Sequence, residues 1–366
     1  MSTTQSLELK AGHRGSVLDR LLGLAADVRA GEGLTALVLA LDGFLVLAAY
    51  YAIRPLRSAF LLPVRIALPG GAVLTGALIQ SYAGAILAGL FLLIVPLYGA
   101  FASKVNRIRL INGLTLFFVS HLAVFYLLGT FGVSTTALGV PFFLWIGIFN
   151  LMVVAQFWSF ANDVYDPQQG KRLFAIVGFG YTVGGIAGSA MTALLARRLD
   201  SFTLMLVSAA MLLASLALRN LVHSREMRRT PAASRDQVER PLGTAGGFQL
   251  VLGQRYLLLI GLLTLTAQLV NTNGNYILNE TLSAMAHQTV ASGTTGGLTE
   301  EQIVRGYMAG TDLWQNILVV CIQFFLVSRI FKYLGVGGGL FVLPVVALGS
   351  YGLLCHRHGS RTGSDF

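Results

Sequence analysis

Nine long apolar runs restrict the fold of this chain more than any other feature of its sequence. A helix needs about 20 apolar residues to cross the roughly 30 Å hydrocarbon layer of a bilayer, and each run is of that order. Only 11% of the 366 residues are charged, which is low for a soluble domain. The sequence therefore predicts an all-α polytopic membrane protein that has the lipid bilayer as its partner. The runs cover residues 33–56, 72–98, 109–132, 139–162, 173–196, 201–220, 255–278, 307–330 and 336–355.

A long polar stretch separates the first six runs from the last three. We interpret residues 221–249 as a basic linker between a six-helix bundle over 33–220 and a partial second bundle over 250–355. A polar tail, 356–366, follows. Residues 1–32 are expected to form a tail with an amphipathic helix and without a cleavable signal peptide. The linker carries Arg225, Arg228, Arg229, Arg235 and Arg240, together with Pro231 and Pro241.

The distribution of basic residues predicts the orientation. With the N-terminus in the cytoplasm, the segments on that side hold 18 Lys and Arg residues and the outer segments hold 8. The positive-inside rule therefore places the N-terminus and the linker in the cytoplasm, in a cell (inner) membrane. The same topology accounts for the formal net charge of +10, so nucleic-acid binding is not predicted.

Enzyme chemistry finds no support in the sequence. The two cysteines, Cys321 and Cys355, lie in apolar runs and cannot build a disulfide framework or a zinc site. No convergent set of His, Cys or carboxylate residues indicates a catalytic or metal site, and no GxxxxGK[ST] motif indicates an ATPase. We expect no enzyme activity, no metal and no cofactor.

The first run combines an acid, an aromatic residue and two cations. At 100° per residue, Asp42, Tyr50, Arg54 and Arg57 lie within about 120° of one another on a helix. Paired arginines suit the geometry of phosphate. The alternative is an aromatic belt with arginines that extend to the outer membrane boundary.

The fourth run ends in a polar stripe that a basic pair follows. Gln156, Ser159 and Asp163 stand at i, i+3 and i+7, so they share a face that points into a cavity or toward a partner helix. Hydrogen bonding between helices without transport is the alternative for this stripe. Lys171 and Arg172 either bind an anion or anchor the helix on the inner side.

Two further stripes predict a polar pore between the bundles. The seventh run has polar residues at i, i+4, i+7 and i+11, which share one helix face. These are Thr264, Gln268, Asn271 and Asn275. The eighth run carries Asp312, Gln315, Asn316 and Gln323.

The fifth run is rich in glycine. Gly180, Gly184 and Gly188 recur every four residues, which is typical of a face on which two membrane helices approach closely. The spacing does not match the GxGxxG dinucleotide motif. We therefore predict a packing surface here.

Two motifs resemble a known family. Residues 51–57 read Tyr-Ala-Ile-Arg-Pro-Leu-Arg, and 157–163 read Phe-Trp-Ser-Phe-Ala-Asn-Asp with Lys-Arg-Leu-Phe at 171–174. They resemble the first-helix and fourth-helix motifs of the nucleotide (ATP/ADP) antiporters of plastids and obligate intracellular bacteria. The resemblance implies a major-facilitator-like fold of two six-helix repeats that exchanges anionic nucleotides. Relative to that family the chain is C-terminally truncated, by three helices.

The resemblance also implies roles for single residues. Arg57 matches a functional basic position and Asp163 a functional acidic one, although the family more often has Lys and Glu there. A third acidic position, in the seventh helix, is matched by the amides Asn271 or Asn275.

From these matches we predict how the substrate is held. Arg54 and Arg57 would neutralise phosphate, and Tyr50 or Trp158 would stack on the base. Asp163 would pair with a cation and hold one state of the transporter.

Two other functions remain open at this point. The first is a carrier of another organic anion or of a proton-coupled solute, in which Asp42, Asp163 or Asp312 titrates. The second is a non-transporting truncated remnant or assembly partner. The sequence does not predict an oligomeric state.

Overall fold

The computed structural model describes most of the chain. The predicted amphipathic helix, most of the linker, most of the ninth run and the polar tail lie outside the described residues. These described residues are 28–29, 32–102, 105–196, 198–229, 251–293, 296–325, 333, 344–350 and 352.

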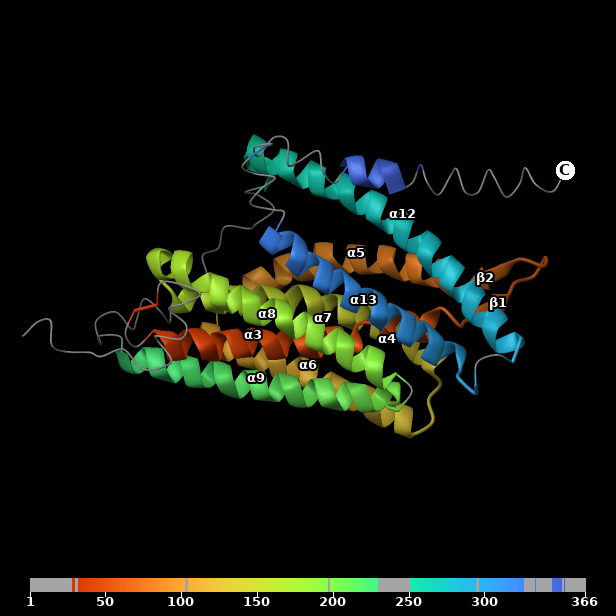
Figure 1. The fold of residues 1–366 in the computed structure, drawn as a ribbon, viewed down its shortest axis with the longest axis horizontal. Coiled ribbons are helices and arrows are strands. Elements are labelled where there is room, and N and C mark those ends of the chain that lie inside the picture. The colour runs from red at the N-terminus through yellow and green to blue at the C-terminus, as the bar shows by residue number, and fades with distance from the viewer. Residues whose placement is uncertain are drawn as a thin grey trace, which may run out of the picture.

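The described residues form a bundle of long helices (Figure 1). Seven spans in it are long and apolar enough to cross a membrane. This confirms a multi-pass membrane protein. The elements are α3 (Gly33–Ile53), α4 (Leu56–Leu61), β1 (Arg65–Ala67), β2 (Val73–Thr75), α5 (Gly76–Ala102), α6 (Arg107–Thr130), α7 (Thr135–Val164), α8 (Pro167–Leu195), α9 (Ser201–Arg229), α12 (Arg255–Ala291) and α13 (Glu300–Phe325).

A small hairpin departs from the all-α expectation. Strands β1 and β2 pair antiparallel, with Arg65 opposite Thr75 and Ala67 opposite Val73. Between them the chain turns at Gly70 and Gly71, whose φ angles of 96° and 84° suit glycine. A three-residue strand is too short to be recognised by alternation, which is why the sequence pattern did not predict it.

Several helix boundaries differ from the predicted runs. The first run is interrupted because Pro55 lacks an amide hydrogen, so α3 ends at Ile53 and α4 begins at Leu56. Helix α9 continues to Arg229, so the first residues of the predicted linker are helical. Helix α12 is 37 residues long and reaches Ala291, well beyond the predicted end of its run.

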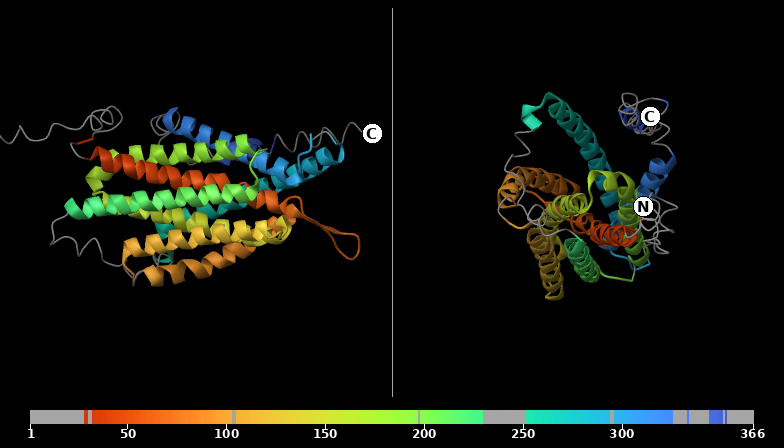
Figure 2. Two further views of the ribbon diagram at one scale, coloured as in Figure 1. Left: turned by 90° about the horizontal axis from the view of Figure 1, so that it is seen from below. Right: turned by 90° about the vertical axis from the view of Figure 1, so that its left-hand side faces the viewer.

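Helix α3 lies at the centre of the first half, which comprises α3 to α9 (Figures 1 and 2). It packs between α8 and α9. The predicted glycine face is confirmed. A Cβ added at Gly180, Gly184 or Gly188 would lie 2.2 to 2.5 Å from a backbone oxygen of α3, so only glycine permits this approach.

Aromatic rings fill the space between α6 and α7. Phe118, Phe125, Phe142, Trp145 and Phe149 are all buried, and neighbouring ring centroids lie 5.2 to 5.7 Å apart. Such ring pairs add about 0.5–1.5 kcal/mol each beyond the area that they bury. Phe149 of this cluster also stacks on Tyr50, near the end of α3.

The second half comprises α12 and α13. Helix α13 lies along α8 and reaches α4 and α3. Helix α12 meets the bundle only through its C-terminal part, where Leu282 and Ala286 are buried against Ala59 and Leu62. Its N-terminal part stands apart from the other helices (Figure 2). The two halves are therefore in contact mainly at one end.

Candidate functional site

An ion pair between the two halves is the centre of the candidate site. Arg54, at the C-cap of α3, places Nη1 2.8 Å from Oδ1 of Asp312 in α13. The side chains keep 25% and 10% of their surface exposed, so the pair is shielded but reachable. The guanidinium also lies 5.3 Å from the centroid of the Tyr51 ring. Arg54 of the first half is thus held by the carboxylate of Asp312 in the second half.

Arg57 lies one turn further on, in α4. Its guanidinium is 5.7 Å from the centroid of the Phe143 ring. Within the described part of the chain, no carboxylate lies within ion-pair distance of Arg57. Asp312 is near enough to interact electrostatically with Arg57, but its carboxylate accepts a hydrogen bond from Arg54. The site therefore has two cations and one anion, which leaves a net positive charge for an anionic ligand.

Tyrosine side chains line the same end of α3. Tyr50 is buried, 5.2 Å from Tyr51 and 6.1 Å from Phe149 between ring centroids. The predicted candidate Tyr50 is therefore part of the aromatic core. Tyr51 is only partly buried and touches Arg54. Tyr51 was not predicted as a site residue, although its position three residues before Arg54 on a helix would have indicated it.

Polar contacts continue along α13 beyond the ion pair. Asn316 stands one turn after Asp312, and its Nδ2 donates to Oγ of Ser189 in α8 at 3.1 Å. Gly185 leaves room for this amide, because an added Cβ would lie 3.2 Å from Oδ1 of Asn316. Two members of the predicted stripe on α13 thus face the first half.

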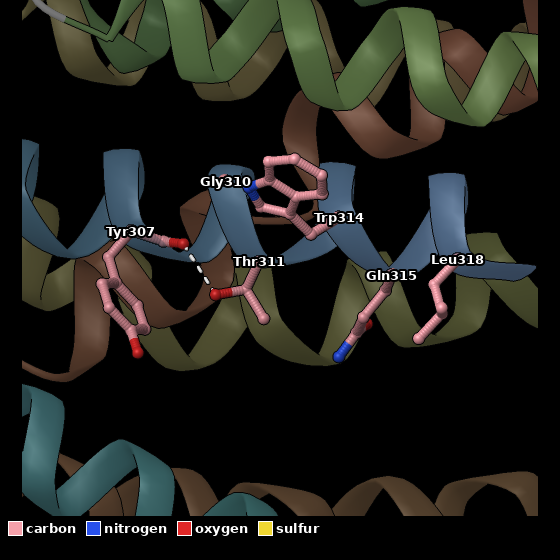
Figure 3. A pocket seen from close by; sticks show the side chains of 6 residues that line it. All are labelled: Tyr307, Gly310, Thr311, Trp314, Gln315 and Leu318. Carbon is pink, nitrogen blue, oxygen red and sulfur yellow. Dashed lines mark hydrogen bonds between the residues drawn. The ribbon is translucent and has the colours of Figure 1, made fainter.

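Gln315, Asn271 and Asn275, which belong to the same predicted stripes, do not reach this site. Gln315 lines an open groove of about 510 Å³ on another side of α13, together with Trp314 (Figure 3). Asn271 and Asn275 are exposed on α12, and Nδ2 of Asn271 bonds Gln268 of the same helix at 3.4 Å. The structure does not bring them together with the arginines.

Asp42 is also separate from the site. Its carboxylate accepts bonds from Arg219 Nε at 3.2 Å and Nη2 at 3.3 Å, and from the hydroxyl of Ser215. Both charged side chains are almost completely buried. Asp42 lies on the predicted helix face but pairs with Arg219 of α9, because twelve residues of helix separate it from Arg54 by about 18 Å along the axis.

The polar stripe of α7 faces neighbouring helices. Oδ2 of Asp163 lies 2.5 Å from Nε of Arg107, the first residue of α6. Arg107 also donates to the hydroxyl of Ser159, and Gln156 donates to the hydroxyl of Tyr98 in α5. Asp163 thus pairs with the cation of Arg107, and its role in holding one state of the transporter stays a prediction. The rest of the stripe forms the interhelical hydrogen bonds that were the alternative.

Trp158 belongs to a second aromatic cluster. Its ring centroid lies 5.2 Å from Phe157, 5.4 Å from Tyr181 and 6.3 Å from Phe174. This cluster joins α7 to the N-terminal part of α8. Trp158 is therefore held by packing, away from the arginine pair.

The predicted basic pair lies at the start of α8, at the opposite end of that helix from the α8–α9 connection. Arg172 bonds both carboxylate oxygens of Glu32 at 3.1 Å, and Gln169 donates to the same group at 3.3 Å. Lys171 is exposed beside a cavity of about 370 Å³ that Asn162 also lines. The two residues therefore cannot act in one site with Arg54 and Arg57.

The environment of Glu32 shifts its acidity. Partial burial raises the pKa of Glu32, but hydrogen bonds from Arg172, from the backbone of Arg29 and from Gln169 outweigh it, so the net pKa is lowered. At neutral pH the group is thus an anion that joins the start of α3 to the start of α8.

Among the described residues, no group of three or more His, Cys, Asp or Glu side chains could hold a metal ion. Comparison of the chain with known protein families, with characterised proteins and with solved structures returns no match.

Proposed function

We propose that this multi-pass membrane protein is an alternating-access carrier that exchanges anionic nucleotides, ATP against ADP, with a major-facilitator-like arrangement of helices. The observation that carries the proposal is the ion pair between Arg54 and Asp312, next to Arg57. It combines surplus positive charge with a contact between the two halves. In a site of this kind, binding of an anion also changes the contact between the two halves.

Phosphate oxygens are the ligand that suits this site best. Arginine offers planar, bidentate donors that match phosphate, and it stays charged at every physiological pH. In the structure Asp312 is the counter-ion of Arg54. An entering phosphate would compete with Asp312 for Arg54 and would engage Arg57 directly. Tyr51, beside Arg54, is better placed to stack on a base than Tyr50, which the core covers.

Competition of this kind would couple binding to movement. A ligand shifts an equilibrium between two states only through a difference in its affinity for them. If phosphate displaces Asp312, the contact between the halves weakens at α13 when the site is filled. When the ligand leaves, Asp312 bonds Arg54 again, and this contact favours one state of the carrier. Exchange of one nucleotide for another follows.

The test is counter-exchange by the purified protein in liposomes. Vesicles loaded with ADP should take up labelled ATP from outside, and empty vesicles should not. We expect Arg57→Ala to lower the initial exchange rate at least tenfold. Arg109→Ala, which removes an exposed arginine of α6, is the matched control and should stay within about twofold of wild type. Absence of counter-exchange in the wild type, or equal rates for Arg57→Ala and wild type, refutes the proposal.

A second candidate uses the same pair differently. Asp312 is a largely shielded carboxylate of α13, and intramembrane carboxylates often carry protons. A carrier of another organic anion coupled to protons would use Asp312 as the proton acceptor. Uptake driven by a pH gradient that nucleotides do not inhibit would favour this candidate.

A further inference from the structure

The contacts between the two halves are concentrated at one end of the molecule. We call this the outer end, and it carries the β1–β2 hairpin and the connection between α12 and α13 (Figure 1). Here Ser283 of α12 donates to the carbonyl of Leu62 at 2.8 Å. Thr75 donates to Glu280 at 3.0 Å, and Arg65 donates to the carbonyl of Ser283 at 3.3 Å. Hydrogen bonds therefore tie α12 to the first half at this end.

Arg305 of α13 makes the most extensive of these contacts. Its Nη2 donates to the carbonyls of Ala196 at 2.6 Å and Leu199 at 2.9 Å, and its Nη1 donates to the hydroxyl of Ser201 at 2.7 Å. Glu301, at 3.8 Å, is the carboxylate beside it. The guanidinium is thus wedged into the corner between α8 and α9.

Electrostatics explain why a buried cation is accepted there. Ala196 is the C-cap of α8, where carbonyl groups lack partners within the helix and the helix dipole is negative. Arg305 is fully buried, yet its Nε has no hydrogen-bond partner in the described structure. Burial of a charge is costly unless its contacts are complete. The contact is therefore specific to this arrangement of the halves and is lost at once if α13 moves away.

Hydrogen bonds between the two halves become fewer toward the opposite end of the interface. Along α13, the hydrogen bond from Asn316 to Ser189 is the last one to the first half within the described residues. Beyond it, Leu318 and Val319 are 59% and 53% exposed. The N-terminal part of α12 is exposed as well. Within the described residues, the hydrogen bonds of α13 to the first half therefore run from the outer end, around Arg305, to Asn316, and none is found beyond Asn316.

We infer that the outer end is a closed gate and that Arg305 is its main positioning residue. In this state the site at Arg54 is sealed from the outer side. Opening to that side requires Arg305 to leave Ala196, Leu199 and Ser201. The inference rests on the proposed transport cycle but not on the identity of the substrate.

Accessibility of a buried position measures the gate directly. In a background with Cys321→Ser and Cys355→Ser, Ala286→Cys introduces a thiol at a fully buried position of the outer end. A membrane-impermeant maleimide is applied to the outer side of sealed vesicles. We expect slow labelling, and labelling at least tenfold faster when Arg305→Gln is added. Met285→Cys, at an exposed neighbouring position, shows full reactivity in every background.

The controls separate the gate from general damage to the fold. Arg198→Gln removes an exposed arginine of the same α8–α9 corner and should leave the labelling of Ala286→Cys unchanged. Equal labelling with and without Arg305→Gln would overturn the inference. Because labelling needs no substrate, a failure of nucleotide exchange does not affect this result.

A cross-link provides a second measurement should Arg305→Gln not fold. The side chains of Ser201 and Glu301 touch across the gate. In the Ala286→Cys background, Ser201→Cys with Glu301→Cys should form a disulfide under oxidation. Labelling of Ala286→Cys should then fall at least tenfold, and a reductant should reverse this. Failure of the pair to cross-link, or unchanged labelling after cross-linking, contradicts the gate.

Discussion

The substitution Asp312→Asn isolates the role of the ion pair between the halves. It removes the charge of the residue that bonds Arg54 and keeps the size of the side chain. If Asp312 competes with the substrate for Arg54, the substitution should strengthen anion binding. If Asp312 instead helps to bind the substrate, the substitution should weaken it.

The size of the effect follows from the geometry. Unit charges about 4 Å apart attract by about 4 kcal/mol at an effective dielectric constant of about 20. Arg54 keeps 25% of its side chain exposed, so water screens part of this attraction. The desolvation of both groups offsets a further part. We expect about 1–2 kcal/mol to oppose anion binding, which corresponds to about 5- to 30-fold in Kd.

The assay is nucleotide binding to detergent-purified protein, measured by calorimetry at low and high salt. Asp312→Asn should bind ATP about 5- to 30-fold more tightly than wild type, and its exchange rate in liposomes should fall because the empty state is no longer held. Glu300→Gln is the matched control. It removes a carboxylate of the same helix that pairs with His287 within the second half, so it should leave the affinity unchanged.

Two results would refute this reasoning. An unchanged or weaker affinity in Asp312→Asn would show that Asp312 does not compete with the substrate. An equal gain in Glu300→Gln would show that the gain reflects the net charge of α13 and not the ion pair.

Three further predictions concern stability, each measured by thermal unfolding of the solubilised protein. Asp42→Ala leaves a buried guanidinium of α9 without its counter-charge and should destabilise the fold by about 3–5 kcal/mol, whereas a loss below about 1 kcal/mol would contradict a buried pair. Glu32→Gln should lower stability at pH 7, and this loss should shrink as the pH falls: because the pKa of Glu32 is lowered in the fold, its bond to Arg172 stabilises above the ordinary glutamate pKa and is lost as pH falls through the lowered one. Gly184→Val should cost at least about 2 kcal/mol because the new Cβ would meet backbone, while Gly178→Val, in open space, should cost far less.

Periodicity predicted what depends on helix geometry alone. The spacing of Gly180, Gly184 and Gly188 places three glycines on one face wherever the helix packs, so the prediction of close packing is confirmed. The length of the apolar runs likewise predicts spans, because the bilayer thickness sets the length of the helix, and seven spans are found among the described residues.

Partners across the fold were less predictable. Asp42 shares a helix face with Arg54, yet each bonds a different helix: Asp42 pairs with Arg219 of α9 and Arg54 pairs with Asp312 of α13. The polar stripes of α12 and α13 looked alike in the sequence. Of these stripes, Asp312 and Asn316 of α13 bond the first half, because α13 lies along α8 and the N-terminal part of α12 does not.

The sequence by itself determined that this chain spans a membrane several times and which residues it could use for an anion, because hydrophobic length and residue chemistry are local properties. Only the tertiary structure decided that Arg54 is held by Asp312, that Arg57 has no carboxylate partner among the described residues, and that Lys171 and Arg172 belong to the other end. The physical reason is that an ion pair depends on distances between helices, and these follow from how the side chains of all the helices pack together.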